Sequence, residues 1–189
     1  MKTARDDLVE LSDYVWRRFR RRMDGLTDDE YFWEPAPHCA TVRPGPDGTF
    51  RADPPSPPGQ PPALTTLAWR LCHLIDLLQA DRNASWLGQP GTSRRGIGEN
   101  GGDDEPPAAP GRGADALIAL DTAYITWNTV LVGTTEKSLS APIGAVAGRM
   151  GRGSRRTFLL HVLDELIHHA AEAALLRDLY AARPVGWIG

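Results

Sequence analysis

Cysteine is scarce in this chain of 189 residues, which holds only Cys39 and Cys72. Two cysteines cannot build a framework of disulfide bonds or a zinc site made of several thiolates. Long apolar runs are also missing, because no stretch approaches the roughly 18 apolar residues that a membrane-spanning helix needs. The first residues lack the charged and then apolar pattern of a secretory leader. We therefore expect a cytoplasmic protein without a membrane role.

An excess of positive charge is absent as well. The formal net charge is −3 at pH 7, whereas a nucleic-acid-binding surface usually belongs to a basic domain. The one basic run, at residues 17–22, is interrupted by Phe19 at a helical spacing. This pattern is typical of the exposed flank of a helix, so we expect no nucleic-acid partner.

No segment alternates between apolar and polar residues for long enough to predict a β-strand. Apolar residues instead recur at spacings of three and four in four segments, at about 4–24, 66–86, 114–131 and 158–180. This spacing predicts four helices. A capping box of Thr27 and Glu30 predicts an additional short helix that ends before Pro35. The segment 66–86 is apolar on nearly every side, so it should be the most buried helix.

Long connections separate these segments. Ten prolines lie between residues 35 and 62, and they exclude a continuing helix or a central strand because proline fixes φ and lacks an amide proton. Residues 88–113 have little apolar content and predict a mobile loop. Within it, residues 96–101 match a phosphate-loop pattern, but no strand precedes them, so a linker is the better interpretation. Residues 133–153 form a further loop.

The fold expected from these segments is all-α. Ser154 is the expected N-cap of the last helix, and the aromatic residues Trp33, Trp69, Trp127 and Tyr124 are expected to pack in the core. Four amphipathic helices joined by long connections predict a single domain, residues 1–189, with the architecture of a four-helix bundle with long crossover loops. In such a bundle, metal sites lie between facing helices.

The last helix has an unusual density of ligand-type side chains: His161, Glu165, His168, His169 and Glu172. At about 100° per residue, Glu165 and His169 point the same way and are flanked by apolar residues. The other three lie toward solvent or the edge of the bundle. A carboxylate and an imidazole four residues apart can offer an oxygen and a nitrogen to the same ion. The alternative is a surface salt bridge, which contributes only about 0–1 kcal/mol.

A third ligand must come from elsewhere, and His73 is the best candidate. It is the only other histidine on a predicted core helix. A site formed by His73, Glu165 and His169 leaves coordination positions open, which suits zinc in a catalytic role, and nickel or iron nearly as well.

Two further histidines of the last helix, His161 and His168, lie close in sequence to this pair. His168 points about 100° away from His169, so we interpret it as exposed or as a partner of Glu172 or Asp164. His161 lies one turn before Glu165, where it either orients that carboxylate or is simply exposed.

Three stretches of the chain resemble the DinB-like family: GLTDDEYFWEP at 25–35, TTLAWRLCHL at 65–74 and HVLDELIHHAAEAALLRDLY at 161–180. This family is a group of bacterial four-helix metal-binding proteins that includes the mycothiol-dependent maleylpyruvate isomerases and other thiol-dependent transferases. The resemblance covers nearly the whole chain.

The family places its metal with one histidine from the second helix and a pair of residues four apart on the fourth. The resemblance therefore implies the same ligands, His73, Glu165 and His169. Many members have histidine at the first position of the pair, whereas the mycothiol-dependent isomerases have glutamate, so Glu165 makes this chain more similar to the actinobacterial thiol-dependent branch. The sequence ends soon after the fourth helix, so we expect the protein to lack the additional C-terminal domain of the maleylpyruvate isomerase.

These observations leave three functional hypotheses. In the first, a divalent metal activates a low-molecular-weight thiol such as mycothiol, which attacks a small-molecule electrophile; the metal supplies the low thiol pKa, so no protein nucleophile is required. In the second, the same metal activates water in a hydrolase. In the third, the bundle is a non-enzymatic metal-binding or stress-associated protein. A homodimer is compatible with each hypothesis.

Overall fold

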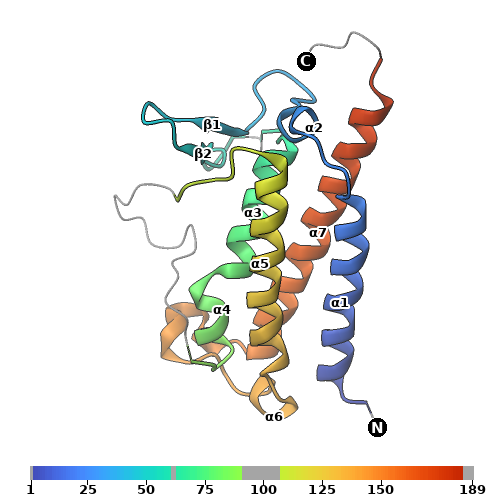
Figure 1. The fold of residues 1–189 in the computed structure, drawn as a ribbon. Helices are drawn as coiled ribbons and strands as arrows, with labels where there is room; N and C mark the ends of the chain where they lie inside the picture. The colour runs from blue at the N-terminus through green and yellow to red at the C-terminus, as the bar shows by residue number, and fades with distance from the viewer. Residues whose placement is uncertain (1, 61–62, 91–106, 185–189) are drawn as a thin grey trace.

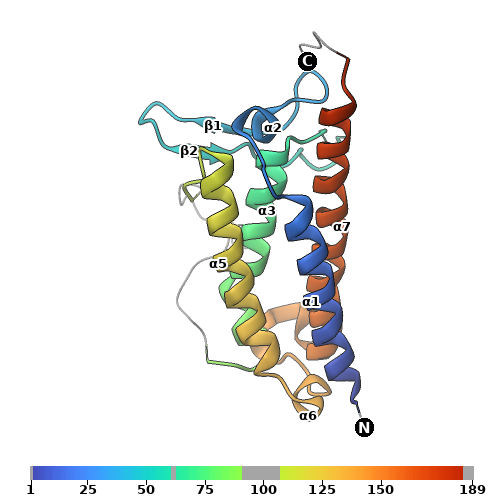
Figure 2. The ribbon, with the colours of Figure 1, turned by 45° about the vertical axis from the view of Figure 1, so that its right-hand side comes forward.

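Helices make up most of the part of the chain that the computed structural model describes, which comprises residues 2–60, 63–90 and 107–184. Helix α3 packs against both α5 and α7, and α1 packs against α7 and α5. The expected all-α character is confirmed. The four long helices lie side by side (Figure 1), as the second view also shows (Figure 2), and they span Ala4–Arg22 (α1), Leu67–Gln79 (α3), Gly113–Val132 (α5) and Arg155–Ala182 (α7).

Shorter elements lie at the two ends of the long helices (Figure 1). Residues 35–62, in which the prolines exclude a continuing helix or a central strand, contain a small two-stranded antiparallel hairpin in which Arg43 pairs with Arg51. The expected loop 133–153 contains two short helices. These elements are α2 (Asp28–Phe32), β1 (Val42–Pro44), β2 (Phe50–Ala52), α4 (Asp81–Trp86), α6 (Glu136–Leu139) and the 3₁₀ helix η1 (Ala145–Arg152).

Side-chain caps fix where several helices begin. The Thr27 hydroxyl accepts from the Glu30 amide, and the Glu30 carboxylate accepts from the Thr27 amide, so the predicted capping box is confirmed. The Ser154 hydroxyl accepts from the Thr157 amide at the start of α7, which confirms the predicted N-cap. Each cap satisfies an amide that would otherwise lack a partner in the first helical turn.

The second long helix is shorter than the sequence predicts. It ends at Gln79, because Ala80 adopts φ −56° and ψ 130°, and the chain then continues as the separate helix α4. The side-chain Nδ2 of Asn83 donates to the carbonyls of Leu77 and Leu78 at 2.7 and 3.2 Å. These bonds satisfy carbonyls at the end of α3 that a helix terminus leaves without partners. The prediction of one helix over residues 66–86 is therefore wrong.

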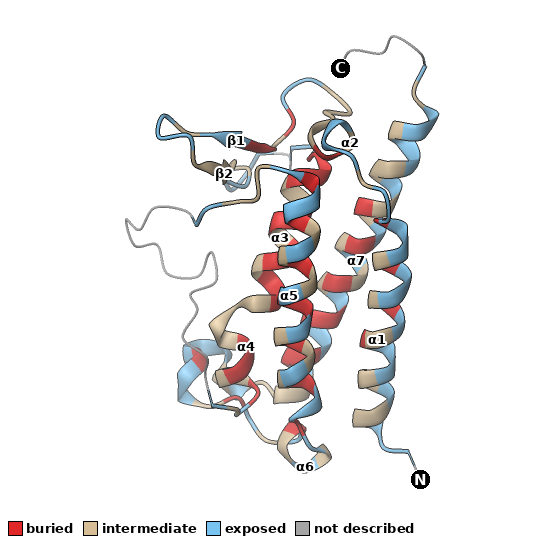
Figure 3. Ribbon diagram, in the orientation of Figure 1, coloured by how far each residue is buried: buried red, intermediate tan, exposed pale blue. Residues whose placement is uncertain are grey.

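The core lies between the long helices, where their buried faces meet (Figure 3). Helix α3 is the most buried of the four, with eight of its 13 residues in the core, as predicted. Trp127 and Tyr124 on α5 are buried, which confirms their expected packing. Trp33 and Trp69 are only partly buried, so their assignment to the core is wrong. The ring of Trp69 instead stacks on the imidazole of His73.

Two further predictions from the sequence concern the loop 88–113 and the lack of a membrane-spanning helix. Most of the predicted loop 88–113 lies outside the described residues, and so does the whole phosphate-loop pattern at 96–101. Within the described ranges, no helix combines the length and the apolar character needed to cross a bilayer.

Candidate metal centre

Three side chains with metal-ligating atoms meet between α3 and α7. His73 comes from α3, and Glu165 and His169 come from α7. His169 Nε2 lies 3.0 Å from Glu165 Oε2, and His73 Nε2 lies 3.7 Å from the same oxygen. One ligand atom from each residue lies within 4.8 Å of the others. The structure thus brings together the three residues that the sequence selects.

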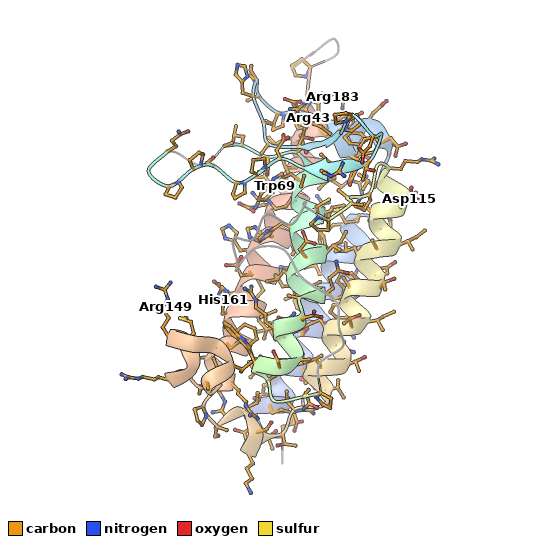
Figure 4. The ribbon with its side chains drawn as sticks, turned by 90° about the vertical axis from the view of Figure 1, so that its left-hand side faces the viewer. Arg43, Trp69, Asp115, Arg149, His161 and Arg183 are labelled. Carbon is orange, nitrogen blue, oxygen red and sulfur yellow. The ribbon has the colours of Figure 1, made fainter. Side chains whose placement is uncertain are left out.

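The register of two packed helices creates this arrangement. Residues i and i+4 of a helix are surface neighbours, so α7 presents Glu165 and His169 together. The residues that follow each of them, Leu166 and Ala170, are buried in the core, which places the pair at the border between core and solvent. Figure 4 looks onto the side of the molecule where Trp69 projects from α3 and His161 from α7.

The imidazole of His73 is held by rings on two sides. Trp69 stacks on it with ring centroids 5.5 Å apart and planes 9° apart, and His169 meets it edge to face at 4.5 Å. The Trp69 indole is itself fixed, because its Nε1 donates to the Asp53 carbonyl at 2.8 Å. His73 Nε2 is buried, and no atom of the described residues hydrogen-bonds to it. A buried nitrogen without a partner is costly, so the fold keeps it there at the expense of stability.

Two residues that the sequence argument did not select surround His169. Its Nδ1 lies 2.7 Å from Glu172 Oε2 and 2.9 Å from Arg70 Nη1. Arg70 Nε lies 3.0 Å from the same Glu172 oxygen, although the angle is too poor for a hydrogen bond, so this contact is an ion pair. Glu172 follows His169 by three residues, a spacing that signals helical neighbours, whereas nothing in the sequence shows that Arg70 faces α7.

The remaining histidines of α7 lie on its outer side. His168 Nε2 is 3.2 Å from Glu172 Oε1, which is one of the pairings expected for it. His161 Nδ1 is 3.9 Å from Glu165 Oε1, and the side chain of His161 is 53% exposed. His161 therefore sits within ion-pair distance of the proposed ligand while remaining open to solvent.

The electrostatics of the cluster set the charge states that metal binding needs. Burial lowers the pKa of His73, and the neighbouring His169 and Arg70 lower it further, so the imidazole is neutral at neutral pH. Burial raises the pKa of Glu165, but His169 and His161 lower it by more, and the net pKa lies below its ordinary value. The pKa of Glu172 is lowered in the same way, since His169 and Arg70 outweigh burial. Both carboxylates are therefore ionised.

The donor set fits a divalent cation. Two imidazole nitrogens and one carboxylate oxygen form a ligand set that zinc uses in catalytic sites, with a further position open. Ligands about 2.1 Å from zinc at tetrahedral angles lie about 3.4 Å apart, and the contacts of 3.0 and 3.7 Å fall on either side of that value. A cation at this point would also give His73 Nε2 the partner that it lacks among the described residues.

Neither cysteine takes part in the cluster. Cys72 precedes His73 but is buried on another side of α3, where it contacts the Tyr31 hydroxyl, and burial raises the pKa of its thiol to about 12. Cys39 is also buried, and its thiol donates to the Ala36 carbonyl at 3.1 Å. Both thiols are therefore protonated at neutral pH and unsuited to attack a substrate.

With this geometry in view, comparisons with known proteins identify the family. The family model of the DinB superfamily matches residues 12–173, so the chain belongs to the DinB superfamily. No curated protein matches the chain. A crystal structure of a conserved protein from Enterococcus faecalis is similar in fold, with a TM-score of 0.55 and 15% identity over 97% of this chain and all of that one. At this identity, the likeness shows the fold alone.

Proposed function

We propose that this protein is a four-helix-bundle enzyme that binds one divalent cation through His73 Nε2, a Glu165 oxygen and His169 Nε2. The observation that carries the proposal is the convergence of three ligand atoms from two helices within 4.8 Å. Trp69 and the core residues of α7 hold these ligands in place. Zinc matches the ligand set best, and nickel or iron are the next candidates.

The chemistry that a bound cation supplies is a lower pKa for a thiol at an open position, which gives a thiolate near neutral pH. The thiol must come from outside the chain, because Cys39 and Cys72 are both buried away from the cluster. Membership of the DinB superfamily, with glutamate as the first ligand on α7, supports a low-molecular-weight thiol of the mycothiol type.

The proposed reaction joins this thiol to a small-molecule electrophile. The thiolate sulfur forms a bond to the electrophilic carbon, and the displaced group leaves with the electron pair of the bond that breaks. The thiol proton passes to solvent. The residues of the chain bind and orient the two reactants. On the solvent side, the exposed imidazole of His161 lies within ion-pair distance of Glu165.

A hydrolytic role has less support. It requires a general base beside the metal, and Glu172 is already held by His169, His168 and Arg70. A non-enzymatic metal site is the other alternative, and His73→Ala separates it from catalysis. Loss of a structural ion would lower the melting temperature sharply, whereas loss of a catalytic ion would remove activity and leave the fold intact.

Two measurements test the proposal. Protein purified without an affinity metal column should contain one divalent ion per chain, as determined by elemental analysis. The metal-loaded protein, given mycothiol or bacillithiol and a panel of electrophiles, should conjugate at least one of them. The His73→Ala variant should lose both the ion and the activity, whereas His168→Ala, a matched change on the exposed side of α7, should keep both. A metal-free wild-type protein, or one inert across the panel, would contradict the proposal.

A further inference from the structure

We propose that Glu172 is a positioning residue for His169: it holds the imidazole in the tautomer whose Nε2 can bind the cation. This inference rests on the metal-binding part of the proposed function. Glu172 Oε2 lies 2.7 Å from His169 Nδ1, on the side of the ring opposite to the nitrogen that faces Glu165 and His73.

The physical reason is that a neutral imidazole carries one proton, and the partner of one nitrogen decides where that proton resides. A carboxylate accepts hydrogen bonds and donates none when it is ionised. Glu172 therefore stabilises the proton on Nδ1, which leaves the lone pair of Nε2 free for a cation. Such carboxylate and histidine pairs behind a metal also fix the ring orientation.

Arg70 makes the contribution of Glu172 necessary. Its Nη1 lies 2.9 Å from the same His169 Nδ1, and a guanidinium donates but does not accept. Without Glu172, Arg70 would donate to a bare Nδ1, and the proton would move to Nε2, where Glu165 Oε2 lies 3.0 Å away as an acceptor. That tautomer cannot bind a cation through Nε2. Glu172 and Arg70 thus favour opposite tautomers of one ligand.

A rival interpretation is a second cation site, because ligand atoms of His168, His169 and Glu172 also lie within 4.8 Å of one another. Arg70 argues against it. Its guanidinium lies beside His169 Nδ1 and Glu172 Oε2, in the middle of the group that a second cation would use, and its side chain is only 13% exposed. A buried positive charge at that point repels another cation. The geometry therefore assigns these side chains to the support of His169.

The experiment measures zinc affinity and stoichiometry by competition with a chromophoric chelator, on metal-free wild-type protein and five variants. Glu172→Ala should weaken binding by about 10–100-fold, the range seen when partners of metal-binding histidines are removed. Glu172→Gln keeps an acceptor oxygen and the side-chain volume, so its zinc affinity should lie between those of the wild type and Glu172→Ala. The double variant Arg70→Met with Glu172→Ala should bind more tightly than Glu172→Ala alone, because the donor that favours the wrong tautomer is gone.

The control is Asp164→Asn, which removes one negative charge from the exposed side of α7 and should change the affinity less than threefold. Circular dichroism of each metal-free variant checks the fold. Long-range nitrogen–proton NMR spectra of the zinc-loaded wild type should show His169 protonated on Nδ1.

Zinc affinity in Glu172→Ala equal to that of the wild type would overturn the inference while leaving the metal site standing. Two zinc ions per wild-type chain, with one lost in His168→Ala, would establish the rival second site. A wild type that binds no zinc would overturn both this inference and the proposed function.

Discussion

Replacing His73 with leucine should stabilise the metal-free protein and abolish its response to metal. His73 Nε2 is buried without a hydrogen-bond partner among the described residues, and burial lowers the pKa of the imidazole. Leucine has a similar volume and no polar atom that needs a partner. Residues retained for a ligand site often reduce the stability of the fold without its ligand.

The magnitude follows from two opposing contributions. An unsatisfied buried polar group costs about 1–3 kcal/mol, and the low end applies because the side chain as a whole is 37% exposed. The lost ring contacts with Trp69 and His169 cost about 0.5–1 kcal/mol. The variant should gain up to about 0.5 kcal/mol, which for a chain of this size raises the melting temperature by about 1–2 °C.

The assay is thermal unfolding with a chelator and then with excess zinc. At a zinc concentration of 100 times the dissociation constant, ligand binding stabilises the wild type by about 2.7 kcal/mol, whereas the leucine variant should show no zinc-dependent shift. His161→Leu, on the exposed side of α7, should keep the full shift. The reasoning is refuted if the metal-free leucine variant melts well below the wild type, or if zinc stabilises both equally.

Three other predictions concern the fold. Glu30→Ala leaves the Arg177 guanidinium, whose side chain is only 16% exposed, without the carboxylate to which it donates at 3.1 and 3.0 Å. Urea unfolding should show a loss of about 3 kcal/mol, the low end for a broken buried pair, because Arg177 also donates to two backbone carbonyls. Burial raises the pKa of Asp76 to about 7, so the folded state holds this proton more tightly than the unfolded state, and stability falls as the pH rises from about 4 to about 7. Asp76→Asn should therefore match the wild type at pH 4 and exceed it by about 1–2 kcal/mol at pH 8, after discounting for partial exposure. Asn83→Ala removes two hydrogen bonds to the end of α3 and should lower the free energy of unfolding by about 1–2 kcal/mol.

Each of these predictions has its own control or contrary result. Glu10→Ala breaks an exposed pair with Lys2 and should cost less than about 1 kcal/mol; an equal cost for Glu30→Ala would contradict the account of a buried pair. An Asp76→Asn variant with the same stability profile as the wild type at every pH would show that the carboxyl is well solvated. An Asn83→Ala variant of unchanged stability would mean that water replaces the lost bonds.

Local signals in the sequence predict most of the helical architecture. The caps at Thr27 and Ser154 form as expected because each depends on residues three positions apart. The sequence does not predict the break at Ala80, because alanine favours helix. The break is stabilised by the side chain of Asn83, which donates to carbonyls at the end of α3. The hairpin within residues 35–62 is not predicted either, because its strands have only three residues each. Three residues are too few to show an alternation of apolar and polar side chains.

The sequence likewise predicts some residues of the candidate site and not others. Helical periodicity alone places Glu165 beside His169, and the scarcity of histidine on the other core segments selects His73. The role of Arg70 depends on the rotation of α3 against α7, which no local pattern reports. Glu172 carries a helical spacing from His169, but only the observed contact distinguishes it from the other polar residues on the outer side of α7.

The most direct test of the central claim is a crystal structure of the zinc-loaded protein with anomalous diffraction at the zinc edge. The account predicts one anomalous peak per chain between α3 and α7, at about 2.0–2.2 Å from His73 Nε2, a Glu165 oxygen and His169 Nε2. A zinc ion bound elsewhere, or no ion between these three side chains, would contradict it.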